Sequence, residues 1–298
     1  MELRTDPLTG VTVAIAGDRQ SRPNLPSDDC PFCPGGLEAP EPYRTRWFPN
    51  RWPSFPEERC EVVLYTPDHE ARFWSLGVAH AAEVVDLWAE RTTALGSRPD
   101  VGYVLVFENR GPEVGATISH PHGQIYAYER VPDVPLRELE RSPSAAGCSL
   151  CAEDPGDRLV AEHGGWRAWV PWASVHPYGV VIAPTTHEPN LPSLDAAGRR
   201  DLAACLIDVL GRLDHLWPQE PGVLPSMLWI HQRPTDGGDW PGAHLHVEVA
   251  VPMRAPGVRR FIAGGELGGG LYVNPVVPEE AAATLRAVTW GEAPTGDA

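Results

Sequence analysis

The sequence predicts an α+β protein with two similar halves that arose by internal duplication. The first observation is a repeated cysteine pair, because CPFC begins at Cys30 and CSLC begins at Cys148, 118 positions later. The second is a histidine 36 positions after the last cysteine of each pair, at His69 and at His187. The third is an H-x-H sequence near the end of each half. A pattern that returns at a fixed interval indicates a duplicated unit.

Each half is expected to contain strands, one long helix and further strands that end near the H-x-H sequence. Strands are predicted where Val, Ile, Leu and Tyr cluster, and helices where apolar residues recur at helical spacing. The predicted strands cover residues 60–68, 100–110 and 123–130 in the first half, and 166–174, 179–187, 226–234 and 244–252 in the second. The predicted helices cover residues 79–96 and 195–217.

Turn-forming residues suggest where the two halves join. The stretch from Val131 to Gly147 contains VPDVP and SPSAAG, and we interpret it as a linker. The sequence therefore predicts one domain over residues 1–140 and a second over residues 141–298. Each is expected to have a mostly antiparallel sheet with packed helices.

Composition excludes several classes of function. The 298 residues include 24 basic and 40 acidic ones, for a net charge of −16, and all 24 basic residues are arginine. Without lysine there is no lysine-bearing phosphate loop and no Schiff-base lysine. The negative charge argues against nucleic acid as a partner. No apolar run reaches the roughly 20 residues of a membrane span, and MELRTDPLTG lacks a signal-peptide core. We expect a cytoplasmic protein with reduced thiols.

The repeated cysteines and histidines predict two metal sites. Two thiolates and two imidazoles suit tetrahedral zinc, and four protein ligands make a closed, structural site. The predicted ligands are Cys30, Cys33, His69 and His120 in the first half, and Cys148, Cys151, His187 and His244 in the second. Competing ligands are His80, His163, His176 and His231, and a CxxC pair by itself is also compatible with redox chemistry.

The two H-x-H segments differ in a way that points to one reactive site. The first reads HPHGQ and the second HLHVE, so Gly123 and Gln124 correspond to Val247 and Glu248. Glycine allows close backbone approach, and a neutral amide can donate to phosphate, whereas an anion cannot. His122 is then a candidate nucleophile for phosphorus, with Gln124 as the group that stabilises the transferring phosphoryl. The alternative is that His122 is an ordinary core or supporting histidine.

Several stretches of the sequence resemble those of a known family. FENRGPEVGATISHPHGQIYA resembles the active-site stretch of galactose-1-phosphate uridylyltransferases, which belong to the histidine-triad superfamily. CPFCPGG is similar to the zinc pair of that family, and RWFPNRWPSF to its nucleotide-binding segment. MLWIHQRP, AHLHVEVAVP and VRRFIAGGEL are similar to motifs of its second half. The resemblance extends over nearly the whole chain.

The resemblance implies two histidine-triad-like domains in a homodimer, and a double displacement that passes through a uridylyl-histidine. The implied substrates are a UDP-sugar and a sugar 1-phosphate, namely UDP-glucose and galactose 1-phosphate. By the same resemblance, phosphate, nucleotide and hexose contacts fall on Arg19, Arg22, Asn50, Asn109, Thr117, Phe261 and Glu266. The last two are expected to come from the partner subunit.

The sequence differs from the family pattern in three places, and these differences leave other interpretations of its function open. Thr117 stands where the family often has serine, and Gly265 where it often has an aromatic residue. Some relatives hold the second metal, iron or zinc, with a Glu and three His, and His231 and His246 leave that possibility open. A different nucleotidyltransferase or a nucleotide-sugar phosphorylase on the same scaffold is therefore an alternative. Two further alternatives are a zinc-stabilised protein that binds nucleotide sugars without catalysis, and a redox protein that uses the CxxC pairs.

Overall fold

One sheet joins the two halves of the chain. In the computed structural model, which describes residues 2–17, 30–56, 58–217 and 223–291, the sheet has nine strands. All neighbouring strands in it are antiparallel. From edge to edge they are β3 (Arg46–Pro49), β4 (Cys60–Leu64), β6 (His122–Tyr128), β5 (Tyr103–Arg110), β10 (Ser226–His231), β11 (His246–Ala250), β9 (Val180–Pro184), β8 (Trp166–Trp169) and β7 (Leu159–His163).

The strand order shows the duplication directly. β6 lies between β4 and β5, β11 lies between β9 and β10, and the halves meet where β5 pairs with β10. Gln124 of β6 is opposite Phe107 of β5. In the same way, Glu248 of β11 is opposite Trp229 of β10. Gln124 and Glu248 therefore occupy equivalent positions, which confirms the correspondence predicted from the two H-x-H segments.

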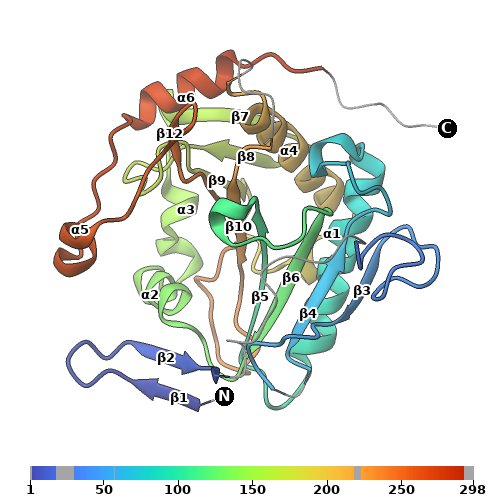
Figure 1. Ribbon diagram of the computed structural model, residues 1–298. Helices are drawn as coiled ribbons and strands as arrows, with labels where there is room; N and C mark the ends of the chain where they lie inside the picture. Colours follow the sequence, from blue (N-terminus) through green and yellow to red (C-terminus); the bar gives the residue numbers. More distant parts are fainter. Residues whose placement is uncertain (1, 18–29, 57, 218–222, 292–298) are drawn as a thin grey trace.

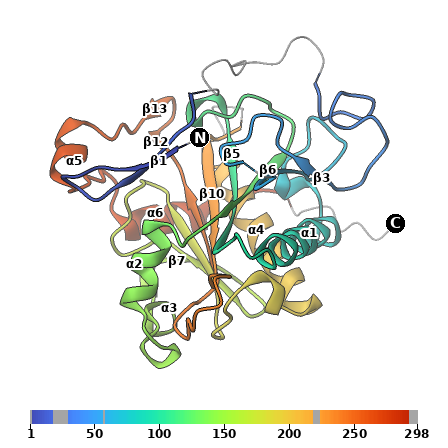
Figure 2. The same ribbon diagram turned by 90° about the horizontal axis from the view of Figure 1, so that it is seen from below.

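Two long helices cover one face of the sheet (Figure 2). The predicted helices are confirmed as α1 (Val78–Gly96) and α4 (Ala196–Asp214), which pack against one another. The side chain of Asp195 accepts a hydrogen bond from the Gly198 amide and so begins α4. Trp88 of α1 and Ile125 of β6 are both buried in the core between helices and sheet. Because side chains alternate along β6, His122 and Gln124 lie on the opposite face from Ile125.

The remaining elements include several that the sequence interpretation did not predict, among them α2. The other α-helices are α2 (Asp133–Arg141), α3 (Ser149–Ala152), α5 (Gly264–Gly269) and α6 (Pro278–Ala287). There are also two small hairpins outside the large sheet. One is formed by β1 (Glu2–Thr5) and β2 (Thr12–Ile15), and the other by β12 (Met253–Ala255) and β13 (Val258–Arg259). α2 lies inside the segment interpreted as a linker, so the central part of that segment is a helix, which the sequence did not predict. Pro135 stands in the first turn, where the missing N–H is tolerated.

The predicted strands are confirmed, with shorter bounds. The strand predicted over residues 166–174 ends at Trp169, because Pro171 cannot donate to a strand ladder. β3 and β7 were not predicted from the sequence. No helix in the described ranges has both the length and the apolar character to span a membrane.

Two segments project from the same side of the molecule, the β1–β2 hairpin and α5 (Figures 1 and 2). Both carry large apolar side chains in contact with solvent. Leu8 is 93% exposed and Phe261, which leads into α5, is 72% exposed. A two-stranded hairpin is marginally stable by itself. We call these two segments the projecting surface.

Candidate active site and metal clusters

Cys30, Cys33, His69 and His120 lie together where β4 ends and β6 begins, as the sequence predicts. Their ligand atoms all lie within 4.8 Å of one another. The Nδ1 atom of His120 is 3.8 Å from the Sγ of Cys30 and 3.7 Å from that of Cys33. The Nδ1 atom of His69 is 3.5 Å from the Sγ of Cys33. Two thiolates and two imidazoles at these separations can surround one metal ion.

A backbone carbonyl fixes which nitrogen His120 offers to a metal. Its Nε2 atom donates to the carbonyl oxygen of Thr66 at 2.8 Å, so the lone pair of the neutral ring is at Nδ1, which faces the cysteines. Burial lowers the pKa of His120 and favours that neutral form. Burial also raises the pKa of the Cys33 thiol, and a bound cation would oppose this shift by stabilising the thiolate.

The second half repeats the arrangement. The Nδ1 atom of His244 is 3.2 Å from the Sγ of Cys148 and 3.4 Å from that of Cys151, and the Nδ1 atom of His187 is 3.4 Å from the Sγ of Cys151. His244 Nε2 donates to the Pro184 carbonyl at 3.2 Å, which again leaves Nδ1 for a metal. Burial lowers the pKa of His244 to about 4 and raises that of Cys151 to about 11. The predicted second Cys2His2 set is therefore brought together.

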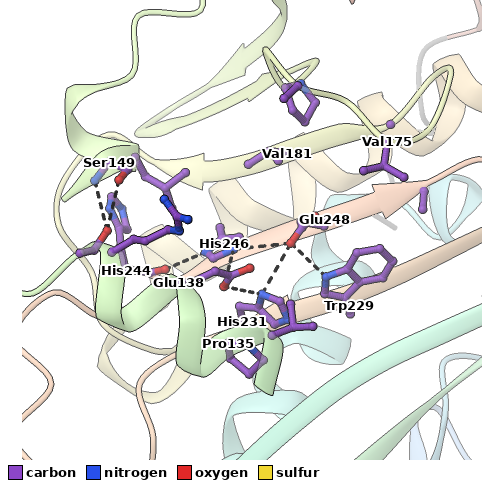
Figure 3. Close-up of a pocket in the computed structure, with 18 of the residues that line it drawn as sticks. Pro135, Glu138, Ser149, Val175, Val181, Trp229, His231, His244, His246 and Glu248 are labelled. Carbon is purple, nitrogen blue, oxygen red and sulfur yellow. Dashed lines mark hydrogen bonds and ion pairs between the residues drawn. The ribbon is translucent and has the colours of Figure 1, made fainter. Parts of the chain in front are cut away.

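A third cluster lies beside the second, in a cavity of about 650 Å³ (Figure 3). Its members are Glu138, His231, His246 and Glu248. The Nδ1 atom of His231 is 2.8 Å from Glu138 and 3.6 Å from Glu248. The sequence pointed to His231 and His246, but not to Glu138, which was assigned to a linker. The signal that could have found it is the three-residue spacing of Leu136 and Leu139, with an acidic residue in the first turn of α2 and Arg141 in its last turn.

The metal clusters give a testable expectation. Cobalt(II) bound by thiolates absorbs strongly in the near ultraviolet, so we expect cobalt-loaded protein to show this band from two sulfur-ligated sites. Cys151→Ser should remove about half of the band, since it affects one of two such sites. Glu138→Gln, the matched control in the sulfur-free third cluster, should leave the band unchanged. A wild-type band that Cys151→Ser leaves intact would exclude metal binding at the second Cys2His2 cluster.

His122 begins β6 two residues after His120. Its Nδ1 atom is 2.7 Å from the backbone carbonyl oxygen of His120. A carbonyl can only accept, so Nδ1 carries the hydrogen and the lone pair of the neutral ring is at Nε2. His246 makes the equivalent contact with the His244 carbonyl at 2.9 Å. The backbone of each metal-cluster histidine therefore orients the second histidine of its H-x-H sequence.

A cavity of about 410 Å³ opens beside His122, and Asn109 and Thr117 also line it. Gln124 lies on the same face of β6 as His122, and its Oε1 atom accepts from Asn50 Nδ2 at 3.3 Å. The structure thus brings His122 together with Asn109 and Thr117 at this cavity and pairs Gln124 with Asn50, although neither Gln124 nor Asn50 lines the cavity. An imidazole with its lone pair at Nε2, next to an amide donor, can attack and stabilise a phosphoryl group.

The other predicted contacts lie elsewhere. Arg19 and Arg22 fall outside the described residues. Phe261 is exposed on the projecting surface, and neither Phe261 nor Glu266 lines the cavity beside His122. The carboxylate of Glu266 accepts from Arg260 and from the amide of Val273. These contacts lower the pKa of Glu266, the backbone amides contributing most.

Comparisons with known proteins show which family this chain resembles. Residues 52–132 match the family described as Galactose-1-phosphate uridyl transferase, N-terminal domain, and residues 149–293 match its C-terminal domain. Galactose-1-phosphate uridylyltransferase of Thermotoga maritima is 35% identical over 96% of this chain and 98% of its own. A solved uridylyltransferase structure has a TM-score of 0.85 at 29% identity, covering 96% of this chain and 98% of that one. The structure of an ADP-glucose phosphorylase from Arabidopsis thaliana has a TM-score of 0.76 at 23% identity over 97% and 99% of the chains, which shows the fold alone.

The duplicated antiparallel sheet and its two H-x-H strands define the two-part α+β class that the sequence predicts. Because the two family matches together cover most of its residues, the chain belongs to the galactose-1-phosphate uridylyltransferase family.

Proposed function

We propose that the protein transfers a uridylyl group from UDP-glucose to a hexose 1-phosphate, with galactose 1-phosphate as acceptor, through a covalent uridylyl-histidine. The observation that carries the proposal is the orientation of His122, whose Nδ1–H is held by the His120 carbonyl. The name of the family, galactose-1-phosphate uridylyltransferase, supports a uridylyl group as the group transferred and galactose 1-phosphate as the acceptor. The choice of UDP-glucose as donor follows the resemblance described above.

In the first half-reaction, Nε2 of His122 attacks the α-phosphorus of UDP-glucose. The N–P bond forms while the bond from that phosphorus to the bridging oxygen breaks, and glucose 1-phosphate leaves with the electron pair. The Nδ1–H donor to the His120 carbonyl stabilises the positive charge that develops on the ring. In the second half-reaction a phosphate oxygen of galactose 1-phosphate attacks the same phosphorus, and His122 leaves as a neutral ring. No proton transfer is required in either step.

The proposal is tested by labelling the donor at one phosphate at a time. UDP-glucose with ³²P in the α-phosphate should leave label on the protein, and galactose 1-phosphate should then remove it as UDP-galactose. UDP-glucose labelled in the β-phosphate should leave none, because that phosphate departs with glucose. Equal labelling by both forms, or by neither, contradicts a uridylyl-histidine.

Gln124 is proposed to donate from Nε2 to a non-bridging oxygen as charge redistributes on the transferring group. Gln124→Ala should therefore lower the rate of adduct formation by roughly 10²- to 10³-fold, the usual loss for one such donor. The matched control is Glu248→Ala, at the equivalent position of the second half, which should change the rate little. The measurement is single-turnover labelling at saturating UDP-glucose, and equal effects of the two variants would contradict the role.

The remaining assignments follow the family resemblance and are part of the proposal. Zinc is the metal proposed for both Cys2His2 clusters, because sulfur and imidazole ligands suit it. We place the protein in the cytoplasm, where cysteines stay reduced and can bind metal. The proposed phosphate, nucleotide and hexose contacts are Arg19, Arg22, Asn50, Asn109, Thr117, Phe261 and Glu266.

A homodimer is proposed because of the projecting surface. Leu8 and Phe261 are mostly exposed there, and apolar surface of this kind marks association sites. A second copy would cover it and could bring Phe261 to the neighbouring active site. Sedimentation at micromolar concentration tests this, and Phe261→Glu should shift the protein toward the monomer. A monomeric wild-type protein would exclude the proposed assembly.

A nucleotide-sugar phosphorylase is the second candidate, favoured by one observation. Gly265 lies at the start of α5, where many family members have an aromatic residue, so this chain lacks that contact to a hexose. The discriminating experiment offers the labelled protein inorganic phosphate or galactose 1-phosphate. Release of labelled UDP by phosphate alone would replace the first proposal with the second.

A further inference from the structure

Asn50 is held from two sides just beyond the end of β3. Its backbone amide donates to the carbonyl oxygen of Cys60 at 2.8 Å. Its side-chain oxygen Oδ1 accepts from the backbone amide of Trp52 at 2.9 Å. The backbone contact fixes the position of the residue, and the contact with Trp52 fixes the orientation of its side-chain amide.

That orientation determines the orientation of Gln124. A side-chain amide has an acceptor at one end and a donor at the other, so an Asn50 whose oxygen faces Trp52 presents Nδ2 elsewhere. Nδ2 lies 3.3 Å from Oε1 of Gln124 and donates to it. Gln124 must therefore place its oxygen toward Asn50, which leaves both Nε2 hydrogens for the side on which a phosphoryl group would lie.

This constraint matters because the terminal torsion of a glutamine is broad and roughly two-fold. With its amide turned the other way, Gln124 would aim a carbonyl oxygen at phosphate oxygens and repel them. In the second half, the equivalent Glu248 accepts from the indole nitrogen of Trp229 at 3.1 Å. Gln124 is opposite Phe107, which has no donor, so the orienting hydrogen bond comes from Asn50 instead.

We propose that Asn50 is a positioning residue that acts through Gln124, by setting which end of its amide faces the transferring phosphoryl group. This inference rests on the proposed uridylyl transfer. It differs from the role that the family resemblance implies for Asn50, which is direct contact with the nucleotide. The two roles predict different kinetics, since a nucleotide contact acts through substrate binding and a positioning residue acts through Gln124.

The test is a double-mutant cycle on the rate of ³²P adduct formation at saturating UDP-glucose. Asn50→Ala should lower this rate about fivefold, the scale of one lost hydrogen bond. Asn50→Asp should lower it further, because a carboxylate accepts from Nε2 of Gln124 and reverses the amide. In a Gln124→Ala background, Asn50→Ala should have an effect of less than about twofold, because contacting residues are not additive.

Asn190→Ala is the matched control. The Oδ1 atom of Asn190 also accepts from a backbone amide, that of Ser193. Asn190 lies at the start of a different turn. It should leave the adduct rate unchanged. Asn50→Asp is isosteric and keeps an acceptor for Trp52, so a cycle between Asn50→Asp and Gln124→Ala remains available if the alanine variant does not fold.

The possible outcomes distinguish failure of the positioning role of Asn50 from failure of the proposed uridylyl transfer. Effects of Asn50 and Gln124 that multiply independently, or an Asn50→Ala effect confined to KM, would overturn the positioning role and favour a nucleotide contact. In either case the wild-type protein still forms the adduct. If the wild-type protein forms no adduct with α-labelled UDP-glucose, the proposed function fails, and the positioning role fails with it.

Discussion

Replacing His122 by glycine is expected to abolish the labelled uridylyl-protein and to lower uridylyl transfer by about 10⁴-fold or more, the scale on which loss of a nucleophile acts. The structure gives a specific reason. His122 presents Nε2 with its lone pair because Nδ1 donates to the His120 carbonyl. The chain has no lysine that could replace it as a nitrogen nucleophile. The measurement is retention of ³²P from α-labelled UDP-glucose after denaturation.

The second half supplies the control for this experiment. His246 begins β11 as His122 begins β6, and it makes the same contact with the histidine two residues before it. His246→Gly should retain the label, because Glu248 and Glu138 make its surroundings unfavourable for phosphate. Label that survives His122→Gly but is lost in His246→Gly would move the nucleophile to the second half.

Loss of the first metal cluster is expected to have the largest effect on stability. Cys33→Ala should release one equivalent of metal per chain and lower the free energy of unfolding by about 3 to 5 kcal/mol, since a structural metal contributes directly to folding. The cluster joins residues 30–33, 69 and 120, which are distant in sequence. Beside it, the separate core cluster of Phe32, Ala39, Val62 and Leu64 is small. Urea unfolding with metal analysis measures both quantities.

Cys205→Ala is the matched control. Cys205 is buried inside α4 and belongs to none of the metal clusters among the described residues. It should keep the full metal content and cost roughly 1 kcal/mol, as a small core truncation does. If Cys33→Ala retains its metal and unfolds like the wild type, the first cluster is not a structural site. Activity should also fall in Cys33→Ala, because the strand that begins at His122 loses its support.

The sequence was informative wherever the chemistry depends on local spacing. The interval of 118 residues between Cys30 and Cys148 reflects a repeated unit, and the structure shows that unit as equivalent strands on one sheet. The helices α1 and α4 were predicted because an amphipathic pattern reports burial of one face directly. The helix around Glu138 was not predicted, because Pro132 and Pro135 in VPDVP indicate a turn by composition. They are nevertheless compatible with the start of α2, because Pro132 precedes the first helical residue and Pro135 stands in the first turn, where a missing N–H is tolerated.

The sequence by itself determined the family, the two Cys2His2 sets that the structure brings together, and the candidate nucleophile His122. These depend on residue types at short or repeated spacings. Only the tertiary structure decided that β5 and β10 join the halves into one sheet, that Glu138 meets His231, and that Asn50 faces Gln124. The reason is physical, since strand register and contacts between distant segments are set by packing of the whole core, which local patterns do not encode.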